Sequence, residues 1–131
     1  MIICCTSCEN NNVHDASLQN RWKLTSITST SGYQTTNVPE KLHLTIEFRD
    51  HSEVIGTGVC NTGRGTYRIN GDSITIDCPF TYMLCLDSQD YIEWEVIFVS
   101  NLFYAQKYII TGDKLVLQSK GDYNLNLDLE K

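Results

Sequence analysis

The stretch GTGVCNTGRGTYRINGDSITI, residues 56–76, decides the fold class. It contains five glycines and an Asn70-Gly71 pair between two runs in which polar and apolar residues alternate. Such a pair between alternating runs is the strongest short hairpin signal. The earlier glycines lie inside an extended run, where glycine marks a bend, a bulge or a close approach of the backbone. The stretch therefore predicts bent β-sheet.

Two chemical interpretations of the same stretch are disfavoured. In a phosphate-binding loop the glycines lead from a strand into the N-terminus of a helix, whereas these glycines lead into another strand. A nucleophilic Cys60 needs a neighbouring base. The three histidines are His14 in the N-terminal tail, His43 at an outward strand position and His51 in a turn. We therefore expect no catalytic residue, no metal and no cofactor here.

The rest of the chain predicts further short strands separated by turns. The expected strands are 21–27, 42–48, 53–60, 66–69, 73–78, 108–110, 114–118 and 123–129, with a short extended piece at 81–86. Residues 29–40 are rich in serine and threonine and contain Pro39, which predicts a loop.

One helix is expected over residues 88–103, with Asp87 or Ser88 as its N-cap. Its apolar residues recur at helical spacing and form one stripe of Ile92, Val96, Val99 and Phe103. Other apolar residues widen this stripe and leave only a narrow polar strip of Asp90, Glu93 and Asn101. A helix this apolar should be clasped by the sheet.

These elements predict a mainly β (α+β) fold in one domain. We expect an antiparallel, strongly curved sheet or partly open β-barrel of about eight short strands, packed around one α-helix. The chain of 131 residues is long enough for one domain with a substantial core.

Charge and hydropathy exclude some partners. The formal net charge is −6, and no Lys/Arg cluster is present to attract a phosphate backbone, so nucleic acid is not an expected partner. No apolar run approaches the roughly 20 residues that a membrane-spanning helix needs.

The N-terminal residues MIICCTSCENNNVHD resemble the end of a bacterial lipoprotein signal. Thr6 and Ser7 precede Cys8, which would be lipidated and become the mature N-terminus, although a charged leader and most of an apolar segment are missing. Residues 1–17 would then be a signal remnant and a flexible tether, with the domain at 18–131. Two alternatives remain: a metal or redox site at Cys5-x-x-Cys8 with Cys4 and His14, and an unstructured tail.

Four sequence patterns occur in the order found in one known family. They are Trp22-Lys23-Leu24, the Gly56-x-Gly58-x-Cys60-Asn61 run followed by Gly65-Thr66-Tyr67, Met83-Leu84-Cys85, and YIITGDKLVL at 108–117. Over residues 18–130 the chain resembles the META domain (HslJ-like) family. It departs from the pattern at Val59, where glycine is usual, and Cys78 is an addition.

The resemblance implies a bacterial cell-envelope protein, often a lipoprotein, with a heat-shock or stress association and a partly open barrel. It implies no catalytic residues. Cys60 and Cys85 occupy the family's cysteine positions, so a disulfide between them is expected, with another pairing or free thiols as alternatives. Gly56, Gly58, Asn61, Gly65 and Tyr67 form the structural motif, in which the Asn61 side chain would tie the bend.

Two functions remain open at this point. The first is a non-enzymatic, monomeric envelope lipoprotein that binds an unknown envelope protein and meets the membrane only through Cys8. The alternative is a small barrel that binds an apolar ligand or lipid in a pocket lined by Tyr82, Tyr91, Trp94, Phe98, Tyr104 and Tyr108. The same aromatic residues would otherwise fill the core. The close carboxylate pairs, Asp87/Asp90 and Glu93/Glu95, are explained by helix capping and solvation rather than by catalysis.

Overall fold

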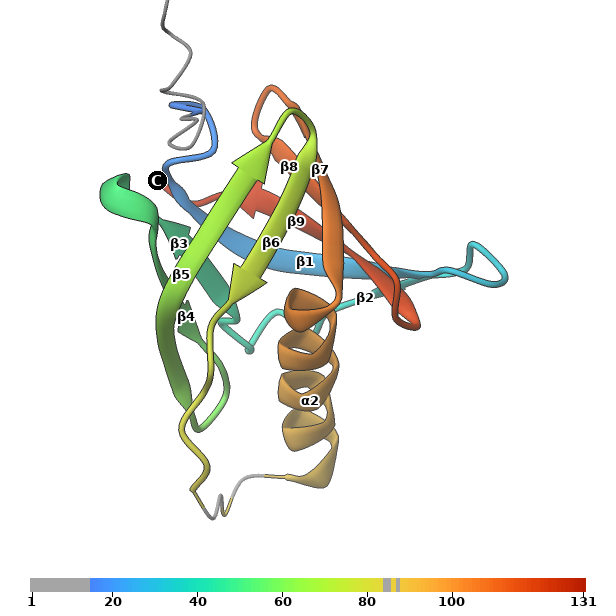
Figure 1. Cartoon of the computed structure of the whole chain (residues 1–131). Coiled ribbons are helices and arrows are strands. Elements are labelled where there is room, and N and C mark those ends of the chain that lie inside the picture. Colours follow the sequence, from blue (N-terminus) through green and yellow to red (C-terminus); the bar gives the residue numbers. More distant parts are fainter. Residues whose placement is uncertain (1–14, 84–85, 87) are drawn as a thin grey trace, which may run out of the picture.

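The computed structural model of the chain describes residues 15–83, 86 and 88–131. Within these residues nine strands form one antiparallel sheet, and one α-helix is inserted between the sixth and seventh strands (Figure 1). The strands are β1 (Arg21–Ser29), β2 (Thr35–Asn37), β3 (Thr45–Phe48), β4 (Glu53–Thr57), β5 (Thr62–Asn70), β6 (Ser73–Asp77), β7 (Ala105–Thr111), β8 (Lys114–Ser119) and β9 (Tyr123–Leu129). The helix is α2 (Gln89–Phe103), and a turn of 3₁₀ helix, η2 (Asp50–Ser52), joins β3 to β4.

The sheet closes into a barrel. Its strand order runs from β2 to β9 with β1 between β2 and β3, and β1 also pairs with β9 over seven residue pairs from Trp22↔Leu129 to Ser29↔Tyr123. Eight strands therefore complete the barrel, and β2 is an extra strand that pairs with the end of β1. The predicted fold class is confirmed, and the barrel is closed rather than partly open.

Side chains of the inward-facing positions fill the barrel. Trp22, Phe48 and several leucines are almost completely buried there, in agreement with the alternation of the strands. The turn at residues 15–20 closes one end, where Leu18 is fully buried and its carbonyl accepts a 3.0 Å hydrogen bond from Trp22 Nε1. Tyr67 of the motif meets Phe48 edge to face, with ring centroids 4.9 Å apart, and its hydroxyl donates to the Arg49 carbonyl.

The helix lies at the other end of the barrel, below the strands in Figure 1. Phe98 and Leu102 reach from α2 into the core cluster. Here the strand pairing of the barrel is weakest. β6 and β7 share one register pair, Ser73↔Lys107, whereas β6 pairs with β5 at five positions and β7 pairs with β8 at six. Beyond that pair β6 and β7 diverge toward the end of the barrel at which the helix lies (Figure 1).

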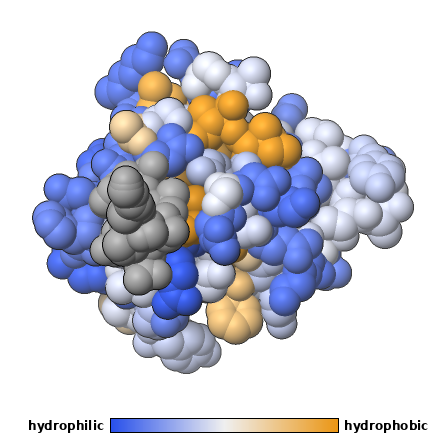
Figure 2. Space-filling model, turned by 45° about the horizontal axis from the view of Figure 1, so that its top comes forward, coloured by the Kyte–Doolittle hydropathy of each residue, from blue (hydrophilic) through white to orange (hydrophobic). Residues whose placement is uncertain are grey.

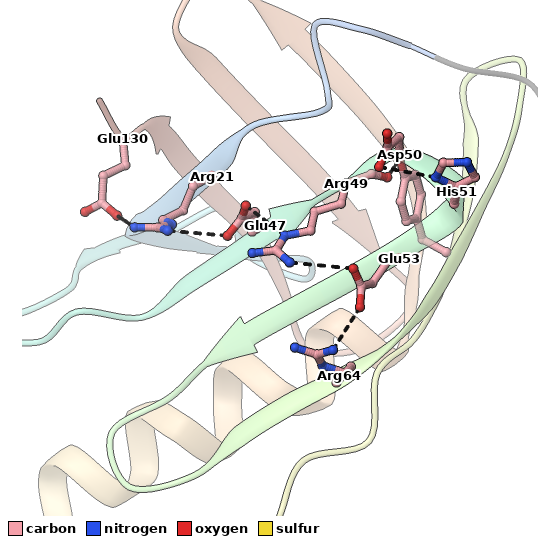
Figure 3. A network of polar contacts seen from close by, with 9 residues as sticks. Arg21, Glu47, Arg49, Asp50, His51, Glu53, Arg64 and Glu130 are labelled. Carbon is pink, nitrogen blue, oxygen red and sulfur yellow. Dashed lines mark hydrogen bonds and ion pairs between the residues drawn. The ribbon is translucent and has the colours of Figure 1, made fainter.

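A ladder of alternating charges covers the outer surface of β1, β3, β4 and β5 (Figure 3). Successive ion pairs, 3.0–3.9 Å long, join Glu130, Arg21, Glu47, Arg49, Glu53 and Arg64. Exposed pairs of this kind contribute at most about 1 kcal/mol each to stability. They leave this surface close to neutral. The face in Figure 2, turned so that the top of Figure 1 comes forward, is also mainly hydrophilic, with a small hydrophobic patch.

Several predicted boundaries differ from the structure. Strand β4 ends at Thr57 rather than Cys60, because residues 58–61 turn to meet the helix. No strand forms at the described residues of 81–86; Phe80 makes only an isolated bridge with Gly63. The predicted loop at 29–40 contains β2, whose residues are all exposed and are held by backbone pairing alone.

Candidate functional site: an apolar groove beside helix α2

Helix α2 begins where a serine can cap it. The Ser88 hydroxyl accepts a hydrogen bond from the Tyr91 amide at 3.3 Å, and Asp90 lies in the first turn, where the helix dipole favours a negative charge. Of the two predicted caps the structure shows Ser88, and Asp87 lies outside the described residues.

The helix does not bury the stripe that its spacing predicts. Val96 is 61% exposed and Phe103 is 68% exposed, and the side chains that are buried are Glu95, Phe98, Asn101 and Leu102. Val96 and Phe103 of this stripe therefore face away from the core. Because the helix is apolar around most of its circumference, its periodicity does not determine which face packs inward.

Glu95 lies on the face that packs inward and anchors it to the turn at 58–61. Its Oε1 accepts hydrogen bonds from the backbone amides of Cys60 (2.8 Å) and Asn61 (3.0 Å), and its Oε2 accepts one from Asn61 Nδ2 (2.8 Å). The carboxylate thus caps the turn at 58–61 in the way that an anion binds to a cradle of backbone amides. Only 9% of Glu95 is exposed. Solvation does not account for this side chain, contrary to the sequence-based interpretation.

The Glu95 carboxyl group stays ionised despite its burial. Desolvation raises its pKa, but the hydrogen bonds from the Asn61 side chain and from the backbone amides of Cys60, Asn61 and Val59 together lower it below the ordinary value of 4.5. A negative charge is therefore fixed between the helix and the turn at neutral pH.

The motif residues around this carboxylate have steric and hydrogen-bonding roles. A Cβ at Gly58 would lie 2.3 Å from Glu95 Oε1, and a Cβ at Gly65 would lie 1.9 Å from the carbonyl oxygen of Asp77. The Asn61 Oδ1 accepts from the Thr81 hydroxyl at 3.0 Å, so Asn61 links the turn both to the helix and to the segment after β6. A side chain at position 65 would therefore collide with the backbone, and one at position 58 would displace the Glu95 carboxylate.

Phe80 holds that segment against the barrel. A Cβ at either Gly56 or Gly63 would lie 2.5 Å from the Phe80 ring, so the ring packs directly on the backbone of β4 and β5. The Thr81 amide also donates to the Thr62 carbonyl at 2.8 Å. These contacts fix the segment against β4 and β5.

A groove of about 810 Å³ lies between this segment and the exposed stripe of α2. One wall is formed by residues 76–83, the other by the stripe, and Glu95 and Asn61 are part of the lining. Eight large hydrophobic side chains are exposed among the described residues, and five of them line the groove: Tyr82, Met83, Val96, Phe103 and Tyr104. An exposed apolar concentration of this kind is characteristic of a binding surface.

The six aromatic residues predicted to form a pocket are distributed over several places. Tyr82, which is 98% exposed, and Tyr104 line the groove. Phe98 is fully buried in the core, and Tyr91 and Trp94 are partly buried against it. Tyr108 lies on β7 and donates its hydroxyl to Asp15 Oδ2 at 2.9 Å.

The described cysteines differ in state. Cys60 is disulfide-bonded and Cys78 is a free thiol that lines the groove. Burial raises the pKa of the Cys78 thiol to about 11, so it is protonated at neutral pH. Cys85, the predicted partner of Cys60, and Cys8, the predicted lipidation site, lie outside the described residues, so both assignments stay predictions.

Sequence reasoning assigned Glu95 to solvation and gave no role to Phe80 or Thr81. It also placed Asn101 in a polar strip, although only 3% of Asn101 is exposed. The Asn101 Oδ1 accepts from the Ser119 hydroxyl at 2.9 Å. The described part of the chain contains no group of three potential metal ligands and no helix that is long and apolar enough to cross a membrane.

Comparison with known families identifies the fold. The family model of the META domain matches residues 16–131. The chain belongs to the META domain family. In this META domain the Cys60-Asn61 pair supplies the amides that bind Glu95, which gives that part of the motif a structural role.

Solved structures show the same barrel. A protein from Burkholderia xenovorans determined by NMR is 16% identical, with a TM-score of 0.70 over 88% of this chain and 86% of that one. A DUF4847 family protein from Bacteroides vulgatus is 14% identical, with a TM-score of 0.63 over 87% of this META domain chain and 94% of its own. A further protein determined by NMR is 22% identical, with a TM-score of 0.63 over 89% and 95%. No curated protein sequence matches the chain.

Proposed function

We propose that this META domain is a non-enzymatic binding protein that holds an apolar ligand in the groove between α2 and residues 76–83. The observation that supports this most directly is the concentration of exposed apolar side chains along the groove. Its volume of about 810 Å³ falls within the range of about 300–1,000 Å³ that is usual for small-molecule sites.

The chemistry of the lining supports binding rather than catalysis. Glu95 already accepts three hydrogen bonds from the turn, so its lone pairs are largely committed to structure. The Cys78 thiol is protonated at neutral pH and is a poor nucleophile.

A neutral fluorescent probe tests the proposal. We expect N-phenyl-1-naphthylamine to bind to the folded protein with increased, blue-shifted emission. Val96→Gln removes an apolar surface from the groove and should weaken binding by about fivefold, since burying part of a valine is worth about 1 kcal/mol. Ile109→Gln is the matched control, because Ile109 is 47% exposed but lies outside the lining. Absent binding, or equal loss in both variants, would contradict the proposal.

We also propose that the protein works at the bacterial cell envelope, tethered through Cys8. The support is the small residues Thr6 and Ser7 before Cys8 and the polar stretch that follows them. Metabolic labelling with an alkyne-tagged fatty acid, in cells that express the full gene, should label the wild type and not Cys8→Ser. Equal labelling of the two would contradict the tether and would leave the groove proposal unaffected.

A further inference from the structure

The negative charge of the chain is concentrated in the segment that builds the groove. Residues 69–106 contain six aspartate and glutamate residues and no lysine, arginine or histidine. The rest of the chain contains ten acidic and ten basic residues, so this one segment accounts for the whole net charge of −6. It includes β6, the segment that carries Phe80 and the whole of α2.

On the barrel wall, by contrast, positive and negative charges balance. In the ladder of Figure 3 Arg21 and Arg49 each lie between two glutamates, and Arg64 pairs with one at the end, so opposite charges neutralise one another. Charges on the wall therefore do not compensate those of the groove. A local excess of one sign beside a low-dielectric apolar surface produces a field that attracts ligands of the opposite sign.

The groove combines this field with aromatic surfaces. Asp77 and Glu95 both line it, and no basic side chain is among its lining residues. Phe103 and Tyr104 meet edge to face with centroids 5.1 Å apart, and Tyr82 stands on the opposite wall. Aromatic faces attract ammonium groups through their quadrupole, and the attraction grows when the cation is partly desolvated.

We propose that the groove selects amphipathic cations, that is, small molecules with an apolar body and an ammonium group. This rests on the proposed function and specifies its ligand class. The apolar body packs against Val96 and Phe103, and the ammonium group lies near Asp77 and the aromatic rings. A second copy of this chain would bring two acidic grooves together, and anionic lipid would be repelled in the same way, so the charge favours neither occupant.

Three surfactants with the same decyl chain test the proposal, each used below its critical micelle concentration. They are decyltrimethylammonium, decyl maltoside and decyl sulfate, and binding is followed by amide chemical shifts of the full chain. We expect the cation to bind about tenfold more tightly than the maltoside at low salt and the sulfate to bind most weakly. The preference should shrink in 0.5 M salt, because screening shortens the range of the field.

Two variants test whether the preference for the cationic surfactant arises in the groove. Asp77→Asn should remove most of the preference for the cation and leave maltoside binding unchanged. Asp50→Asn is the matched control, because it removes one exposed carboxylate in η2, at the end of the barrel away from the helix, and should change neither (Figure 1).

The outcomes separate the two proposals. If all three surfactants bind equally, the charge selectivity is overturned while the apolar groove stands. If none binds, both proposals fail. Preferential binding to phosphatidylglycerol vesicles, or dimerisation through the groove in sedimentation experiments, would show a different occupant and overturn the inference.

Discussion

Glu95→Gln tests whether a buried charge holds the helix in register. The carboxylate accepts from two backbone amides and from the Asn61 side chain. The new amide would place a donor against Asn61 Nδ2, unless the Asn61 amide turns over and exchanges its bond with Thr81. Even then the backbone amides lose a charged acceptor, and hydrogen bonds to charged groups contribute about 1.5–3 kcal/mol against about 1 kcal/mol for neutral ones. We therefore expect a loss of about 2 kcal/mol at pH 7.

The pH dependence distinguishes this charge from simple packing. The folded pKa of Glu95 lies below the ordinary value of 4.5, so its ionised form stabilises the fold fully above about pH 4.5. That contribution is lost as pH falls through the folded pKa. The free-energy difference between wild type and Glu95→Gln should therefore be largest near neutrality and should shrink toward zero as pH falls.

Urea unfolding at several pH values between 3 and 7, followed by the fluorescence of Trp22 and Trp94, measures this difference. Glu93→Gln is the control, because Glu93 is exposed on the same helix and should change stability by less than about 0.5 kcal/mol. A difference below 0.5 kcal/mol at pH 7, or one that does not change with pH, would refute the role assigned to the Glu95 charge.

Three further predictions concern the barrel. Gly65→Ala should lower the free energy of unfolding, measured in urea, by at least about 3 kcal/mol, because its Cβ would lie 1.9 Å from a backbone oxygen. Gly71→Ala is the control: its Cβ would meet open space at φ +63°, and it should cost about 1 kcal/mol. Similar losses in the two variants would contradict the steric role of Gly65. Non-reduced peptide mapping should link Cys60 to Cys85, and a link to an N-terminal cysteine would show another pairing. Burial and its bond to a carboxylate raise the pKa of Tyr108 to about 12, so Tyr108→Phe should remove the last phenol in an alkaline absorbance titration. The stability that this pKa shift contributes is present below pH 10 and is lost as pH rises to 12. If Tyr108→Phe instead removes a phenol that titrates near pH 10, the raised pKa of Tyr108 is contradicted.

Local patterns predicted the elements whose determinants lie close together in sequence. The Asn70-Gly71 turn, the strand at 123–129 and both ends of the helix follow from turn chemistry, alternation and capping, and the structure shows them within about a residue of their expected positions. Strand β2 was missed because its three exposed residues carry no alternation, and only backbone pairing with β1 defines it.

The candidate site was harder to predict, because its determinants are distant in sequence. Glu95 is 34 residues from Asn61, and nothing in a helical pattern distinguishes a glutamate that binds a turn from one that faces water. That contact, with the buried Phe98, Asn101 and Leu102, anchors the inward face of the helix. The stripe that contains Val96 and Phe103 was identified correctly as one face of the helix, but its spacing does not show that this face is exposed.

The helix carries exposed groove-lining side chains on one face and buried anchoring side chains beside it, of which Glu95 and Leu102 also border the groove. Residues that anchor α2, such as Glu95, Phe98 and Leu102, are buried, while Val96 and Phe103 make up part of an open wall. Substitutions on that wall can therefore accumulate without weakening the protein. This division offers protein engineers a scaffold in which ligand preference can be altered by substitutions on one face of the helix, with little loss of folding stability.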